Sequence, residues 1–113
     1  MKVIMPDMAH NSIDNLFEYL AIYSSKNAIQ TTEKIYDYIS NLENMPYLGK
    51  YSSELPNKNF RELIFNKKQN SYRILYYISE IENKIYIVNV SNCKQNFNRI
   101  LKLHNYFNSF LES

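Results

Sequence analysis

The sequence predicts an α+β fold, with an N-terminal antiparallel helical hairpin packed on a small, mostly antiparallel sheet of three to four strands and followed by a C-terminal helix. Two observations predict it. Apolar residues recur at helical spacing in two stretches before residue 45. Three short apolar runs then follow within residues 60–90, separated by short polar turns. Turns of this length indicate antiparallel neighbours, because parallel pairing needs a long crossover.

Length and composition are those of one small globular domain covering residues 1–113. The chain has 113 residues, 45% of them hydrophobic, and charges of both signs are interspersed. Such a composition argues against disorder. The net charge of +2 is too small for nucleic-acid binding by bulk attraction alone.

The sequence also indicates a compartment. Cys93 is the only cysteine, which excludes a disulfide framework and fits a reducing environment. The opening segment is interrupted by Pro6 too soon for a signal peptide. No stretch approaches the roughly 20 apolar residues of a membrane span. We therefore expect a cytoplasmic protein with no membrane association.

Each helix of the predicted hairpin has its own start signal. A short strand over residues 2–5 ends at Pro6, and Asp7 is expected to cap the first helix. Asn27, with Gln30 three residues on, resembles a capping box for the second helix. The apolar stripes comprise Ile13, Leu16, Phe17, Leu20 and Ala21, then Ala28, Thr32, Ile35, Ile39 and Leu42. Residues 45–49 break the helical pattern, and residues 50–59 are expected to form a loop.

The strands are expected at residues 60–65, 71–78 and 84–90. Alternation places Arg73, Leu75 and Tyr77 on one sheet face and the even-numbered residues between them on the other. We expect the hairpin to pack on the even-numbered face. The predicted contacts are Leu16, Leu20, Ile35, Ile39, Tyr72, Ile74 and Val88. A weaker stripe from Phe97 to Leu111 predicts the final helix.

Arg61 and Arg73 are the candidate functional residues, because each lies within an otherwise apolar strand. A charge there is costly unless it is paired or directed to solvent or a ligand. One interpretation is a salt bridge, for example between Arg61 and Glu54. The other is a cationic floor on the exposed sheet face that binds phosphate. Both interpretations remain open from the sequence.

No metal or cofactor site is predicted. His10 and His104 are the only histidines, and no carboxylate lies at a ligand spacing from either. Glu80 and Glu82 fall in a predicted turn and are interpreted as a solvated pair. Cys93 is interpreted as a small buried or half-buried side chain.

Several segments together resemble the RelE/ParE superfamily of bacterial toxins from type II toxin–antitoxin systems. Phe60-Arg61-Glu62-Leu63 looks like the family's Leu-Arg-Glu-Leu strand. Residues 72–76 look like its Tyr-Arg-Ile-x-Tyr strand, and residues 45–49 look like its Pro-x-x-Gly segment. The likeness extends over most of the chain through the order and spacing of these elements.

The resemblance implies a small cytoplasmic growth-inhibiting toxin that a cognate antitoxin neutralises. Two activities occur on this fold. RelE-like members cleave mRNA on the ribosome, whereas ParE-like members act on DNA gyrase. The fold does not distinguish them, and the site residues must.

This sequence matches only some of the residues of the RelE-like site. Arg61 and Arg73 match basic strand positions, but the second basic position of the first strand falls on Leu63. After the last strand, Lys94 supplies the charge, and the position of the C-terminal catalytic tyrosine falls near Arg99. His104 is a candidate acid or base only if its helix folds back over the sheet. RNA cleavage needs an acid–base pair as well as cations.

We therefore predict a ParE-like toxin that inhibits an essential target such as DNA gyrase, without a small-molecule cofactor. Arg73, Leu75 and Tyr77 are predicted to contact the antitoxin, and Lys102 and Phe107 to be needed for toxicity. The alternative is a ribosome-dependent mRNA endonuclease with Arg73, Arg61 and Lys94 as catalytic residues. A further alternative is a degenerate, non-toxic antitoxin-binding module.

Overall fold

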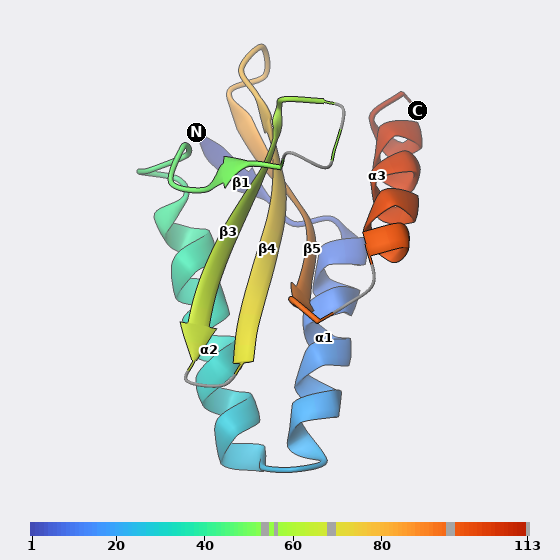
Figure 1. The fold of residues 1–113 in the computed structure, drawn as a ribbon. Helices are drawn as coiled ribbons and strands as arrows, with labels where there is room; N and C mark the ends of the chain where they lie inside the picture. Colours follow the sequence, from blue (N-terminus) through green and yellow to red (C-terminus); the bar gives the residue numbers. More distant parts are fainter. Residues whose placement is uncertain (53–54, 56, 68–69, 95–96, 113) are drawn as a thin grey trace.

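The chain forms three helices and five strands in the computed structural model, which describes residues 1–52, 55, 57–67, 70–94 and 97–112. In chain order these are β1 (Lys2–Ile4), α1 (Asp7–Ala21), α2 (Ser25–Asn41), β2 (Lys50–Tyr51), β3 (Phe60–Lys67), β4 (Asn70–Ser79), β5 (Lys84–Asn92) and α3 (Phe97–Glu112). Figure 1 shows α1 and α2 as an antiparallel hairpin and α3 as a separate helix beside the sheet. The predicted α+β architecture is confirmed.

All five strands belong to one sheet in the order β1-β5-β4-β3-β2. The three long strands pair antiparallel, as predicted, and β2 adds two residues antiparallel to β3. β1 pairs parallel with β5, and the long intervening chain makes this possible. The sheet therefore has one strand more than the upper bound predicted, because a two-residue strand within residues 50–59 leaves no pattern in the sequence.

α1 starts within one residue of its predicted position, whereas the N-cap of α2 is Ser24 and not the predicted Asn27, three residues later. Asp7 is the first residue of α1 rather than its cap, so its carboxylate still lies at the positive helix start. α2 starts at Ser25, because the Ser24 hydroxyl accepts a hydrogen bond from the Asn27 N–H at 3.1 Å. On α2, Thr31 is the buried threonine and Thr32 is only partly buried.

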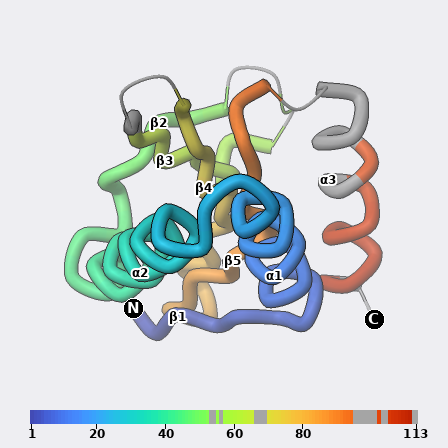
Figure 2. Tube along the Cα trace, turned by 90° about the horizontal axis from the view of Figure 1, so that it is seen from below, coloured from blue at the N-terminus to red at the C-terminus, as the bar shows by residue number. Residues whose placement is uncertain are grey.

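The helical hairpin covers one sheet face, which we call the hairpin face. Figure 2 shows α1 and α2 side by side against the sheet. The buried cluster there contains the predicted Leu16, Leu20, Ile35, Ile39, Tyr72 and Ile74. These predicted packing contacts are confirmed.

Val88 was expected on the hairpin face and lies on the opposite one. The β4–β5 turn aligns Ile78 with Ile85 and Tyr76 with Ile87. The odd-numbered residues at the start of β5 therefore share the hairpin face with the even-numbered residues of β4, and Val88 falls in the opposite cluster. A bulge beyond Ile87 then shifts the register by one residue, which returns Val90 to the hairpin face.

The opposite face of the sheet, which we call the α3 face, carries a smaller cluster centred on Phe107 of α3. Leu55, Phe60, Leu75, Tyr86 and Val88 are buried with it. None of the described helices is long and apolar enough to cross a membrane.

Candidate functional site

Arg61 and Arg73 lie on opposite faces of the sheet. Arg61 is aligned with Tyr76 of β4, a residue of the hairpin face, whereas Arg73 is aligned with Ile64. Residues directly opposite each other in a ladder share a face. The shared cationic floor considered from the sequence is therefore not formed.

Arg61 is held by the segment that connects α2 to β2. Its Nη1 donates a hydrogen bond of 2.8 Å to the carbonyl of Gly49. Its guanidinium also lies over two tyrosine rings, 4.9 Å from the centroid of Tyr47 and 4.3 Å from that of Tyr51. Cation–π contacts of this kind offset part of the cost of removing the charge from water. Arg61 thus fastens the connection to the sheet; its suggested partner Glu54 lies outside the described residues.

Tyr76 also holds the segment that connects α2 to β2. Its hydroxyl donates to the Pro46 carbonyl at 2.9 Å and accepts from the Gly49 N–H at 2.8 Å. A Cβ on Gly49 would lie 2.7 Å from both the Tyr76 hydroxyl and the Glu62 carbonyl oxygen, so this position needs glycine. Burial raises the pKa of Tyr76, and the Gly49 N–H opposes that shift. The Pro-x-x-Gly spacing is therefore explained by Tyr76, a buried tyrosine of β4.

Arg73 is paired with a carboxylate. Its Nε lies 3.4 Å from Glu62 Oε1, and the two side chains are 14% and 15% exposed. Glu62 Oε1 also accepts a hydrogen bond of 3.1 Å from Ser52. The Arg73 Nε is buried without a well-aligned hydrogen bond to any described residue. Of the two interpretations, a salt bridge is therefore the one observed for Arg73, and its partner is Glu62.

Cys93 lies near this ion pair. Burial raises the pKa of its thiol, Arg73 lowers it, and Glu62 raises it. A thiol of raised pKa is a poor nucleophile. The half-buried position predicted for Cys93 is confirmed.

The predicted antitoxin contacts are partly covered by α3. Leu75 is 1% exposed and Phe107 is fully buried, so neither is available to a partner while α3 is docked. The ring centroid of Phe107 lies 5.6 Å from that of Tyr77 and 5.9 Å from that of Phe60. The expectation that this face is open around Leu75 is wrong, because the C-terminal helix occupies it.

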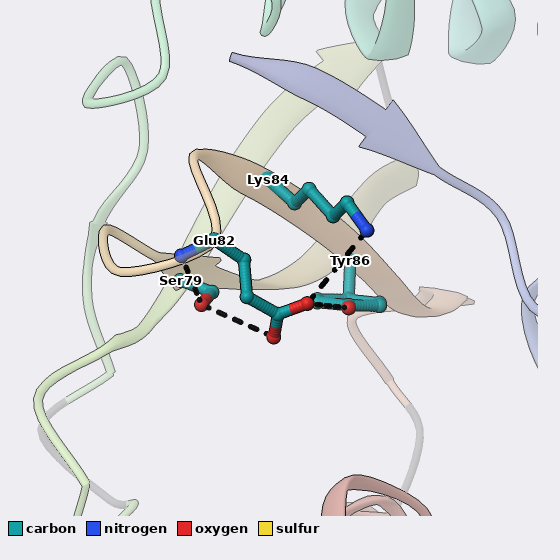
Figure 3. A network of polar contacts seen from close by, with 4 residues as sticks. All are labelled: Ser79, Glu82, Lys84 and Tyr86. Atoms are coloured by element: carbon teal, nitrogen blue, oxygen red, sulfur yellow. Dashed lines mark hydrogen bonds and ion pairs between the residues drawn. The ribbon is translucent and has the colours of Figure 1, made fainter.

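A network of polar contacts joins the residues around the β4–β5 turn (Figure 3). Glu82 accepts a hydrogen bond of 2.9 Å from the Tyr86 hydroxyl and lies 3.7 Å from the Lys84 ammonium. Ser79 accepts from the Glu82 N–H at 3.3 Å. Burial raises the pKa of Tyr86, and the Glu82 carboxylate raises it further. Because the Tyr86 ring also contacts Phe107, this network links the turn to the docking site of α3.

Lys94, just after β5, and Lys102, on α3, are exposed. The side chains of Arg99 and His104 lie outside the described part of the structure. Among the described residues, no three His, Cys, Asp or Glu side chains gather to hold a metal ion. A groove of about 710 Å³ lies beside Lys94, bounded by α1, the end of β5 and Tyr106 of α3.

Comparison with known proteins identifies a toxin family. A family model described as the ParE toxin of the type II toxin–antitoxin system, parDE, matches residues 3–97. The chain belongs to this family. A solved structure described as the chromosomal ParDE TA system from P. aeruginosa has the same fold, with a TM-score of 0.65 at 14% identity, covering 81% of this chain and 95% of that one. No curated protein matches the sequence.

Proposed function

We propose that the chain is the toxin of a type II toxin–antitoxin system, that it arrests growth by binding an essential target such as DNA gyrase, and that a cognate antitoxin neutralises it. Membership of the ParE family supports the first part of this proposal. The separation of the two candidate arginines supports inhibition by binding rather than RNA cleavage.

Both arginines already have partners within the protein, and this observation favours inhibition by binding over RNA cleavage. Arg61 is committed to the Gly49 carbonyl and two tyrosine rings, and Arg73 is committed to Glu62. A phosphorane-like transition state needs several cations converging on one point. The two guanidinium groups lie on opposite faces of the sheet, so they cannot converge on one phosphate.

The exposed side of α3 is the surface we propose for the target. Lys102, Tyr106 and Phe110 are exposed there, and the two aromatic rings are 65% and 43% exposed, respectively. Exposed aromatic residues next to a cation are typical of protein-binding surfaces. Phe107 points inward, so its predicted role in toxicity becomes one of holding α3 in place.

Induced expression tests the mechanism directly. DNA damage, filamentation and inhibition of gyrase supercoiling in vitro are expected, without mRNA cleavage. Lys102→Glu should reduce toxicity at least several-fold, whereas Lys34→Glu, on the exposed side of α2, should leave it unchanged.

Two outcomes would overturn this proposal. Ribosome-dependent mRNA cleavage that disappears in Arg73→Ala, with the melting temperature preserved, would establish the nuclease instead. Normal growth during expression of a folded, antitoxin-binding protein would indicate a non-toxic module.

A further inference from the structure

The turn between β4 and β5 carries a fully exposed isoleucine. Residues 80–83 form this turn, and Ile81 within it is 101% exposed. The other turn residues have local roles: Asn83 adopts a φ of 58°, which asparagine tolerates, and the Ser79 hydroxyl accepts a hydrogen bond from the Glu82 N–H. Ile81 has no such role, because a β-branched side chain is not among those that stabilise a turn.

The carboxylates on either side of Ile81 are each held by a tyrosine from elsewhere in the chain. The Tyr47 hydroxyl donates a hydrogen bond of 2.8 Å to Glu80 Oε1. The Tyr86 hydroxyl donates one of 2.9 Å to Glu82 Oε2, as Figure 3 shows. A side chain that is held in place before binding loses less conformational entropy when a partner covers it. The turn therefore presents its isoleucine as a preorganised apolar anchor.

The charges around the isoleucine identify the chemistry of its partner. Glu80 and Glu82 are both exposed, and Lys84, 3.7 Å from Glu82, offsets one of them, so the turn keeps a negative charge. Nucleic acid and anionic lipid headgroups would be repelled by this charge. A second copy docking turn against turn would bring like charges together. A pocket of another protein, apolar inside and rimmed by lysine or arginine, is complementary to both features.

The turn adjoins the side of α3 that we propose for the target. Phe110 of α3 is 43% exposed, and its ring centroid lies 6.2 Å from that of Tyr86. Tyr86 also holds Glu82, so a single tyrosine connects the end of α3 to the turn. Figure 1 shows the turn, in light orange, and the C-terminal end of α3 at the same end of the molecule, opposite to the loop that joins α1 and α2.

We propose that the β4–β5 turn is a second contact between the toxin and its target, in which Ile81 enters an apolar pocket of the target protein and Glu80 and Glu82 pair with cations at the rim of that pocket. This assignment rests on the proposed function, because it takes the partner to be the target. The target surface then has two parts, the exposed aromatic side of α3 and the tip of the turn.

Binding to purified DNA gyrase and inhibition of its supercoiling activity test the isoleucine. Ile81→Ser should weaken both about tenfold or more, because the pocket loses an aliphatic side chain. Ile81→Leu keeps the apolar volume and should stay within about threefold of the wild type. Ile22→Ser removes an isoleucine that is 77% exposed at the opposite end of the molecule, and it should behave like the wild type. The melting temperature should be unchanged in all three variants, because both positions are exposed.

A second pair of variants tests the charge of the turn. Glu80→Gln can still accept the hydrogen bond from Tyr47 but has lost the negative charge. It should weaken binding to gyrase about threefold at low salt and less at high salt, as expected for an exposed charge contact. Glu33→Gln, at an exposed position of α2, is the matched control and should bind like the wild type at both salt concentrations.

The outcomes separate this proposal from the proposed function. Equal inhibition of gyrase by the wild type, Ile81→Ser and Glu80→Gln would refute the contact through the turn and leave the proposed function standing. A lower melting temperature in Ile81→Ser that accounts for its weaker binding would show a structural role and would also refute the contact. A dimer of the wild type that Ile81→Ser dissociates would identify a second copy as the occupant instead. A wild-type protein that neither binds nor inhibits gyrase would overturn both proposals.

Discussion

The two faces of the sheet are covered in different ways, and the difference separates the stable part of the molecule from the adaptable part. The hairpin face packs against two helices through a continuous, mainly aliphatic cluster. The α3 face packs against one C-terminal helix through a few aromatic rings around Phe107. It also carries the ion pair between Arg73 and Glu62. We therefore expect stability to be concentrated on the hairpin face, because the cluster that α3 covers is the smaller of the two.

Truncating the hairpin face should have the largest effect. Leu16 and Ile39 are 8% and 4% exposed. Leu16→Ala and Ile39→Ala should each lower the free energy of unfolding by about 2–5 kcal/mol, as buried large-to-small changes do. Urea denaturation measures this, with Ile22→Ala, at a 77% exposed position, as the control. Losses under about half a kilocalorie at both sites would show that the helices are not anchored there.

Truncating the centre of the α3 face should have a smaller and more local effect. We expect Phe107→Ala to cost at most about 3 kcal/mol, because Phe107 packs in the smaller cluster and the larger one does not include α3. Hydrogen exchange should accelerate in α3 while the amides of β3 and β4 remain protected. Tyr106→Ala, at a 65% exposed position on the same helix, is the matched control. Loss of protection throughout the sheet would contradict the division between the two faces.

The connection held by Tyr76 should give the smallest effect, and one that depends on pH. Tyr76→Phe should cost about 1–3 kcal/mol at neutral pH, because the Gly49 N–H loses its partner. Burial raises the pKa of Tyr76 above its ordinary value of 10.0. Above that pH the unfolded tyrosine ionises first, so the free energy of unfolding should fall as pH rises, until the folded hydroxyl also ionises.

In Tyr76→Phe the decline above pH 10 should be shallower than in the wild type. Chemical denaturation at several pH values measures it. Tyr23→Phe, at a 76% exposed position, serves as the control. An identical slope in Tyr76→Phe and the wild type would mean that this hydroxyl does not contribute.

The sequence was sufficient to predict the features that depend on the local periodicity of apolar residues. The stripes ending at Leu20 and Ile39 identified the hairpin and its buried face, since helical spacing determines which side chains share a side. Strand alternation placed Tyr72 and Ile74 correctly for the same reason. The order of elements also identified the toxin superfamily, which the family match confirms.

The predictions that failed concern the way in which neighbouring strands are paired. The register of β3 on β4 decides whether Arg61 shares a face with Arg73, and a shift of one residue would reverse the answer. The register of β5 on β4, which places Val88 on the α3 face, is likewise a property of the pair of strands. The docking of α3 over Leu75 depends on tertiary contacts of weakly patterned residues.

The parallel pairing of β1 with β5 has a consequence for the time at which the fold closes. Lys2 pairs with Lys84, so the first strand waits for almost the last part of the sheet to be synthesised. The hairpin of α1 and α2 forms earlier, with its apolar stripe still uncovered, because closing contacts between distant residues is the slow step. A growing chain therefore exposes Leu16 and Ile39 to its surroundings until β5 emerges, and it holds neither the groove nor the α3 face before that moment. These surfaces therefore form only near the end of synthesis.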